Sequence, residues 1–281
     1  MSLTASIVLH RTPPGQLIAA MRCLLGEEAV EHIYLVDNSP DDSLRRLCLG
    51  FGPRAEYLRV PNRGYGAGHN EALRRALRRG AAFHLVLNAD VCWEGSVLTP
   101  MLRYMKDHPD TGMMQPRIIY PDGALQLSAR MLPTPLDLFA KRFLPQSLTR
   151  RRMERYLLAR RSHSGPFDCP YLCGSFLLMS TSALRLTGIF DERFFMYPED
   201  IDITRRMHRS HRTLYWPHVT VTHVHAAASR RSMRMLRIHL LNMARYFAKY
   251  GWISDPSRRD MNRRLLQSTI PLDAPLSPAR G

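Results

Sequence analysis

Two acidic motifs have the residue types and the setting to do chemistry. Asn88-Ala89-Asp90 directly follows an apolar run at residues 83–87, which places Asp90 on a turn at the end of an expected strand. A hard divalent cation such as Mg2+ or Mn2+ takes few protein carboxylates and completes its shell with phosphate oxygens of the substrate. Asp90 fits that requirement, although the same three residues are also typical of an ordinary turn or a helix N-cap.

The second acidic motif, Glu199-Asp200, stands with Asp202 at the start of an expected helix. Acidic residues at a helix start commonly do no more than stabilise the helix dipole. In a crevice, one of these carboxylates could take a proton from an attacking hydroxyl while Arg206 orients the others. Adjacent carboxylates also raise each other's pKa, which suits a base.

Two further segments could bind a substrate. Asp37 and Asn38 follow an apolar run and could contact a base or a ribose, or simply make a turn. The glycine-rich segment 62–70 leads into a helix expected from Glu71, a setting that favours phosphate. His69 stands where a dinucleotide fingerprint needs its last glycine, so that particular motif is excluded.

Histidines form a third candidate site near the end of the second half. His223 and His225 alternate along an expected strand and therefore point to the same face. This spacing allows one metal ligand and one packing residue. A hydrolytic zinc site needs three protein ligands and an open position, so a zinc hydrolase is disfavoured.

Alternating strand and helix signals must position these side chains. Apolar runs predict four strands in the first half, at residues 6–10, 33–36, 57–60 and 83–87, with helices at 16–25 and 71–79. This rhythm is typical of a mostly parallel sheet with helices on both faces. Such sheets bind ligands beyond the carboxyl ends of their strands. His10, Asp37 and Asn88 stand at such ends, so we expect them to converge on one crevice.

Patterns in the second half of the sequence predict strands at residues 176–179, 213–216 and 219–223 and a helix at residues 232–250. The helix has an apolar face and an arginine face. It either packs on the protein or, with the basic segment 141–161, contacts anionic lipid. From Ser254 the chain is polar and ends in proline-rich sequence, which predicts a poorly ordered tail.

Composition narrows the choice of partners. The 281 residues are 45% hydrophobic, which is enough to form the core of one large α/β domain. The formal charge of +16 indicates an anionic partner. No aromatic stacking platform, basic recognition helix or zinc finger supports nucleic acid. The five scattered cysteines contain no Cys-x-x-Cys pair and favour a reducing, cytoplasmic setting. Neither a signal peptide nor a membrane span is expected.

In order and spacing, these motifs resemble the family 2 glycosyltransferases, most closely the bacterial rhamnosyltransferase branch that builds surface polysaccharides on a lipid carrier. The resemblance runs from about residue 6 to residue 252. It lies in eight ordered segments, at residues 35–39, 62–70, 87–91, 115–117, 121–123, 128–134, 188–195 and 197–202.

The resemblance implies roles for the candidate residues. Asp200 would be the catalytic base beside Glu199, and Asp90 would bind Mg2+ or Mn2+ with His223, or with His225 as second choice. Asn88 replaces the first Asp of the family's common Asp-x-Asp triplet, which leaves Asp90 as the only direct carboxylate ligand. The residues expected to bind the donor are His10, Asp37, Asn38, Asn62, Gly64, Asn70, Asn88, Asp90 and Arg206.

The implied protein is an inverting transferase with a GT-A fold: a Rossmann-like, mostly parallel sheet flanked by helices, with a C-terminal amphipathic helix. It would move a sugar, rhamnose from dTDP-rhamnose or another dTDP- or UDP-sugar, to a glycan or a polyprenyl-diphosphate-linked acceptor. A non-catalytic sugar-nucleotide-binding protein and a basic nucleic-acid-binding protein are the alternatives.

We expect a GT-A domain over residues 1–229, divided into a nucleotide-binding half at 1–115 and an acceptor half at 116–229. The basic amphipathic helix at 230–253 and a flexible tail at 254–281 follow. A cytoplasmic protein is expected, at the inner face of the plasma membrane where its basic surfaces bind anionic lipid.

Overall fold

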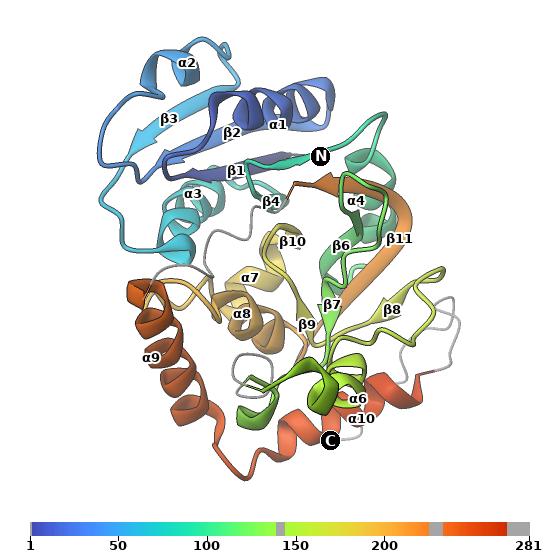
Figure 1. Cartoon of the computed structure of the whole chain (residues 1–281). Coiled ribbons are helices and arrows are strands. Elements are labelled where there is room, and N and C mark those ends of the chain that lie inside the picture. The colour runs from blue at the N-terminus through green and yellow to red at the C-terminus, as the bar shows by residue number, and fades with distance from the viewer. Residues whose placement is uncertain (1, 139–143, 225–232, 269–281) are drawn as a thin grey trace.

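The computed structural model describes residues 2–138, 144–224 and 233–268. Helices flank a central nine-stranded sheet (Figure 1). The strands are β1 (Leu3–Leu9), β2 (Val30–Asp37), β3 (Ala55–Arg59), β4 (Phe83–Leu87), β5 (Val91–Cys92), β6 (Thr111–Ile119), β7 (Ala129–Arg130), β8 (Phe167–Asp168), β9 (Tyr171–Leu172), β10 (Phe176–Ser180) and β11 (Arg212–His223). Strands β7 and β9 pair with each other in a separate two-stranded ribbon. The helices are α1 (Pro14–Gly26), α2 (Arg45–Leu49), α3 (Tyr65–Arg79), α4 (Leu98–Asp107), α6 (Gln146–Tyr156), α7 (Thr181–Thr187), α8 (Glu199–Met207), α9 (Met233–Tyr250) and α10 (Pro256–Gln267).

The sheet has the order β3-β2-β1-β4-β10-β6-β11-β5, with β8 beside β11. Strands β3, β2, β1 and β4 are parallel to one another, and β6 is parallel to β11. Strand β10 runs antiparallel between β4 and β6 and joins these two groups. The predicted mostly parallel sheet with flanking helices is therefore confirmed. The strands expected at 213–216 and 219–223 are one strand, β11, whose register shifts between Trp216 and Thr220.

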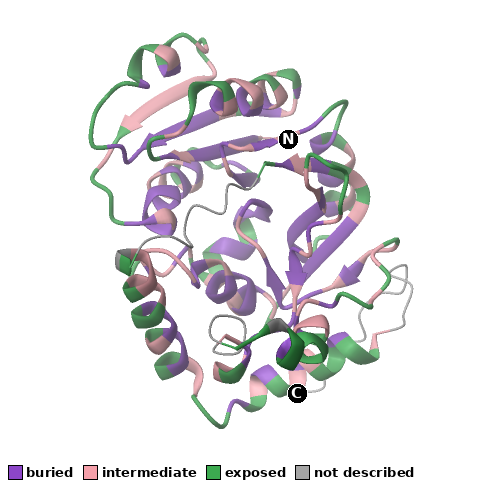
Figure 2. Cartoon of the chain, in the orientation of Figure 1, coloured by how far each residue is buried: buried purple, intermediate pink, exposed green. Residues whose placement is uncertain are grey.

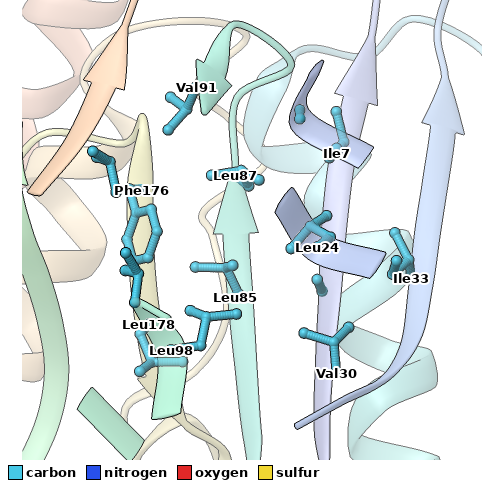
Figure 3. Close-up of a cluster of buried hydrophobic side chains, with 14 of the residues drawn as sticks. Ile7, Leu24, Val30, Ile33, Leu85, Leu87, Val91, Leu98, Phe176 and Leu178 are labelled. Atoms are coloured by element: carbon cyan, nitrogen blue, oxygen red, sulfur yellow. The ribbon is translucent and has the colours of Figure 1, made fainter. Parts of the chain in front are cut away.

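Side chains that alternate along the buried strands pack into two cores on opposite faces of the sheet. Leu85 and Leu87 of β4 pack in the cluster that includes Leu24 of α1 and Leu98 of α4, as Figure 3 shows. Val86 lies between them in sequence and joins the cluster formed with α3, α7 and α8. Figure 2 shows the central strands as buried, with exposed positions on the outer helices. Both faces of the sheet are thus covered, and its carboxyl ends remain for a site.

Two buried histidines form a polar network inside this sheet. His84 Nδ1 lies 2.7 Å from Thr4 Oγ1, and His84 Nε2 lies 2.8 Å from Ser6 Oγ. The same Ser6 hydroxyl is 2.7 Å from His69 Nδ1. Burial lowers the pKa of His84 to about 3, and burial together with the charge of His84 lowers the pKa of His69 well below its ordinary value. Both imidazoles are therefore neutral in the folded protein.

We expect acid to destabilise the fold through His69 and His84. Below pH about 6.5 the unfolded chain binds protons at these histidines that the folded chain does not. Each histidine therefore lowers the free energy of unfolding by about 1.4 kcal/mol for each pH unit of further acidification. The free energy of unfolding, measured in urea, should fall by about 2–3 kcal/mol between pH 7.5 and pH 5.5 from these two residues. His84→Gln should remove roughly half of that slope. An unchanged slope in this variant would contradict the assignment.

The C-terminal segments pack more closely than the sequence indicated. The amphipathic helix is confirmed as α9, and its second half packs on the domain through Met243, Tyr246 and Phe247, although Ser232 lies outside the described residues. The tail prediction is wrong for α10, because Met261 and Leu265 of this helix are buried in the same core. Residues 269–281 of the expected tail lie outside the description. Within the described residues, no helix is sufficiently long and apolar to span a bilayer.

Candidate active site

The first acidic motif lies where β4, β5 and β11 meet. Asp90 occupies the turn between β4 and β5, and β5 pairs with the end of β11. This pairing brings His223 Nε2 to 3.2 Å from Asp90 Oδ1. Asn88 Nδ2 lies 3.5 Å from the same imidazole nitrogen. The structure therefore brings together Asn88, Asp90 and His223, as the sequence predicted, while His225 lies outside the described residues.

Gln126 is a neighbour of this group that sequence reasoning missed. Its Oε1 lies 2.7 Å from His223 Nδ1 and accepts a hydrogen bond from it. With the proton on Nδ1, the lone pair of a neutral imidazole is on Nε2 and faces the Asp90 carboxylate. A histidine that binds a metal is commonly held in this way by an acceptor on its other nitrogen. Gln126 therefore holds the His223 ring in the orientation that a metal ligand would need.

The two side chains fit part of the shell of a divalent cation. Two ligands at right angles around an octahedral ion, each about 2.1 Å from it, lie about 3 Å apart. Asp90 Oδ1 and His223 Nε2 are separated by 3.2 Å. No group of three His, Cys, Asp or Glu side chains among residues 2–138, 144–224 and 233–268 could hold an ion. The protein would therefore supply two ligands and leave the others to a substrate.

Gln126→Leu should weaken metal binding by about 10- to 100-fold, because His223 would lose the acceptor that fixes its tautomer. Binding of Mn2+ in the presence of pyrophosphate, followed by electron paramagnetic resonance, measures this effect. Gln126→Glu keeps an acceptor oxygen in place and is the matched control. Equal Mn2+ affinity in wild type and Gln126→Leu would show that Gln126 does not act through the metal site.

The second acidic motif begins α8, with Pro198 at the N-cap position. Asp200 Oδ2 accepts a hydrogen bond of 3.1 Å from the amide of Gly174, and Oδ1 accepts one of 2.8 Å from the amide of Ile201. Glu199 is buried, and its Oε2 has no hydrogen-bond partner among the described residues. The two carboxylates therefore differ: donors surround Asp200, whereas Glu199 is less well solvated.

This difference separates the roles of the pair. Burial and the charge of Asp200 raise the pKa of Glu199, so the protonated form of Glu199 is favoured. Burial also raises the pKa of Asp200, but the amides of Gly174 and Ile201 and the charge of Arg130 oppose that effect. A carboxylate whose charged form is stabilised by hydrogen bonds from amides, and which is only half-buried, suits proton abstraction. The geometry therefore favours Asp200 over Glu199 as a base.

Tyr65 connects the two acidic motifs and was not among the predicted site residues. Its hydroxyl lies 2.9 Å from Asn88 Oδ1 and 2.6 Å from the carbonyl oxygen of Gly174. Burial and the charges of Glu199, Asp200 and Asp90 raise its pKa well above the ordinary tyrosine value. Tyr65 is thus a neutral donor in a single site that includes both motifs.

The glycine-rich segment packs closely against its neighbours, and the helix start expected near Glu71 was wrong. Helix α3 already begins at Tyr65, and the Tyr65 amide donates to the carbonyl of Phe195. A Cβ on Gly68 would lie 2.8 Å from Val8 Cγ2. Gly64 has a φ of +109°, and a Cβ there would lie 2.0 Å from the Phe195 carbonyl oxygen. Gly64 is therefore needed for close approach of backbones, and its contact with the donor stays a prediction.

The expected nucleotide side is assembled at the ends of β1 and β2. His10 Nδ1 lies 3.1 Å from the carbonyl oxygen of Asn38 and 3.4 Å from Asn62 Nδ2. Asp37 is fully buried, and its two oxygens accept hydrogen bonds of 2.8 Å from the Ser39 amide and the Tyr57 hydroxyl. The structure thus places His10, Asn38 and Asn62 together, and Asp37 stabilises the turn beneath them. Contact of Asp37 with a base stays a prediction.

Two residues expected to bind the donor have structural roles. Asn70 is fully buried and hydrogen-bonds to the amide and the carbonyl of Phe190. Arg206 donates to Asp202 Oδ2 at 2.8 Å and to the carbonyls of Thr187, Gly188 and Ile189. Both side chains hold the 187–192 segment against the domain. Their polar atoms bind other groups of the protein, and contact of either side chain with the donor stays a prediction.

Two sequence comparisons both match this chain to glycosyltransferases. The model of the family described as Glycosyl transferase family 2 matches residues 17–187. An N-acetylglucosaminyl-diphospho-decaprenol L-rhamnosyltransferase of Mycobacterium tuberculosis is 29% identical over 217 residues, which cover 71% of this chain and 68% of the relative.

Solved structures with low sequence identity share the fold. A mannosyltransferase from Pyrobaculum calidifontis, in complex with GDP-Man and Mn2+, has a TM-score of 0.58 and 15% identity over 95% of this chain and 70% of its own. GalNAc-T7 with UDP, GalNAc and Mn2+ has a TM-score of 0.59 and 14% identity over 80% of this chain. This chain spans only 43% of the GalNAc-T7 chain. The likenesses establish a GT-A fold.

Proposed function

Because the chain belongs to glycosyl transferase family 2, we propose that it is an inverting transferase that moves rhamnose from dTDP-rhamnose to a polyprenyl-diphosphate-linked sugar. That it is a glycosyltransferase follows from the family; the donor, the acceptor and the role in surface-polysaccharide synthesis are proposals. The rhamnosyltransferase relative supports them. The observation that carries the catalytic part is the arrangement of Asp90 with His223 and of Asp200, joined through Tyr65.

The proposed reaction is a single in-line displacement. Asp200 takes the proton of an acceptor hydroxyl, whose oxygen attacks C1 of the donor sugar. A bond forms between that oxygen and C1 as the bond from C1 to the diphosphate breaks, and the electron pair leaves with the diphosphate. Attack from the face opposite to the leaving group inverts the configuration at C1. Glu199, kept protonated by burial, leaves Asp200 as the charged member of the pair.

A divalent cation at Asp90 and His223 would stabilise the negative charge that develops on the departing diphosphate. The Mn2+ in two of the structurally similar transferases supports such a cofactor. In this chain, Asp90 and His223 would hold the ion, and Gln126 would orient His223. Asn88 and Tyr65 would contact donor oxygens beside it. Mg2+ and Mn2+ both suit this set of ligands.

A panel of nucleotide sugars with Mg2+ or Mn2+ tests the donor, since a bound donor stabilises the fold by mass action. We expect dTDP-rhamnose to raise the melting temperature most and its sugar to appear, with inverted configuration by NMR, on a prenyl-diphosphate-linked N-acetylglucosamine. Stabilisation without transfer would indicate a sugar-nucleotide-binding protein. A larger shift with another donor, or with nucleic acid alone, would overturn the proposed substrate or the proposed function.

We also propose that the enzyme binds the anionic surface of the membrane, as a lipid-linked acceptor requires. Leu148 on α6 and Leu240 and Leu241 on α9 are exposed, and α6 carries several exposed arginines. Apolar side chains next to arginines suit a surface of acidic lipids. Flotation with vesicles of acidic lipid should recover the protein at low salt and lose it at high salt. Equal recovery with neutral vesicles would contradict an electrostatic contact.

A further inference from the structure

Arg130 is a half-buried cation beside the proposed base, and above it appears only as one influence on the pKa of Asp200. It lies on β7, directly opposite Tyr171 of β9 in the two-stranded ribbon. Its guanidinium carbon is 5.7 Å from the centre of the Tyr171 ring, and the Tyr171 hydroxyl is 3.5 Å from Asp200 Oδ2. The charge of Arg130 is one of the influences that lower the pKa of Asp200. Arg130 is thus separated from the base by one side chain.

The guanidinium is poorly satisfied by the protein. Its Nε donates to the carbonyl of Leu127 at 2.8 Å, and within the described part of the chain it forms no salt bridge. The other buried arginines of α8 and α10, Arg205 and Arg258, each have Asp255 as an acidic partner. A guanidinium has five N–H donors and remains charged at any ordinary pH. Among the described residues only its Nε donates a hydrogen bond to the protein, so the terminal N–H groups of Arg130 are suited to an anion from outside the chain.

The order of contacts indicates which substrate would supply that anion. Asn88 contacts Tyr65, Tyr65 contacts Gly174, and the amide of Gly174 binds Asp200. Tyr171 then follows Asp200, and Arg130 follows Tyr171. The donor diphosphate belongs at the Asp90 end of this series, and the acceptor hydroxyl belongs at the base. In this series of contacts Arg130 comes after the base and last from the Asp90 end, which favours the acceptor as the source of the anion.

We infer that Arg130 binds a phosphate oxygen of the acceptor and thereby places the acceptor sugar at Asp200. The inference rests on the proposed transfer to a diphosphate-linked acceptor. Arginine suits this contact because its planar fork can donate two parallel hydrogen bonds to one phosphate. Selection would follow: a sugar on a diphosphate would be used in preference to the same sugar on an uncharged chain.

Two soluble acceptors test the contact: farnesyl-diphospho-N-acetylglucosamine and an uncharged octyl N-acetylglucosaminide. In Arg130→Gln, kcat/KM for the diphosphate acceptor should fall by about 10- to 100-fold, mainly through KM, because a hydrogen bond between charged groups is lost. Any effect of Arg130→Gln through the pKa of Asp200 acts on both acceptors equally, so the ratio of kcat/KM for the diphosphate acceptor to kcat/KM for the octyl glycoside is the measure of the contact and should fall. Arg130→Lys should recover part of that ratio. Arg78→Gln, an exposed change on α3, is the matched control and should change neither value.

The donor arm distinguishes the source of the phosphate. If Arg130→Gln raised KM for the donor and left the acceptor preference intact, the anion would be the donor diphosphate and the inference would be overturned. Calorimetric binding of the farnesyl acceptor tests the contact even without turnover. Equal Kd in wild type and Arg130→Gln, or no binding by wild type, would also overturn it. Wild-type binding without sugar transfer would instead contradict the proposed function.

Discussion

Asp200→Asn is expected to reduce sugar transfer by about 100- to 10,000-fold, the usual contribution of a general base, with donor binding near the wild-type value. Asn keeps the size of the side chain and one oxygen that can accept from the Gly174 or Ile201 amide. It cannot accept the proton of the acceptor hydroxyl. Initial rates with saturating substrates measure the loss, and thermal shift with the donor measures binding.

Glu199→Gln is the matched control for this change. Since burial and the charge of Asp200 raise the pKa of Glu199, the protonated form is favoured, and glutamine resembles that form. Most of the activity should remain. If Asp200→Asn retained more than a few per cent of wild-type activity and Glu199→Gln did not, the base would be Glu199. The base is inactive when it is protonated, and burial raises the pKa of Asp200. As the pH is lowered, wild-type turnover should therefore begin to fall at a higher pH than it would with an exposed aspartate.

Local patterns in the sequence were sufficient to predict the sheet and the acidic ends of its strands. Buried β4 is apolar except for His84 and is followed by Asn88, so its position and direction could be read from adjacent residues. The start of α8 at Glu199 could be predicted equally well, because Pro198 and three acidic residues fall within the five positions 198–202. These features depend on neighbours within a few residues, and the structure confirms them.

Residues whose roles depend on distant partners could not be assigned in this way. Gln126 meets His223 across 97 positions, and Tyr65 meets Gly174 across 109. Asn70 and Arg206 are polar residues within matching motifs, which suggested ligand contact. Apart from the Glu192 carboxylate that Asn70 also contacts, their partners at residues 187–192 are backbone groups of another segment, which no pattern of side chains reveals.

The buried ion pair between Arg205 and Asp255 is expected to have the largest effect on stability. Two hydrogen bonds, of 2.8 and 2.6 Å, join the guanidinium to the carboxylate, and both side chains are at most 3% exposed. Arg205→Met would leave the Asp255 charge buried with only Arg258 nearby, at 3.9 Å. We expect a loss of about 3–5 kcal/mol in the free energy of unfolding, measured in urea.

A second variant tests whether the loss comes from the unpaired charge. Asp255 is also the N-cap of α10, where its side chain accepts from the Arg258 amide, so Asp255→Asn removes the charge and keeps an N-cap residue. Added to Arg205→Met, it should restore most of the lost stability, and the double-mutant cycle gives the coupling energy. Additive losses would contradict this explanation.

The same pair bears on catalysis through α8, the helix that begins with Glu199 and Asp200. Arg205 connects this helix to α10, and the Tyr250 ring of α9 lies 3.9 Å from its guanidinium carbon. If the ion pair only stabilises the fold, the Arg205→Met and Asp255→Asn double variant should turn over at the wild-type rate per folded molecule. If it also holds Asp200 at the Gly174 amide, kcat should remain low after stability is restored. Measuring kcat at equal fractions of folded protein therefore separates the stability of the domain from the positioning of its base.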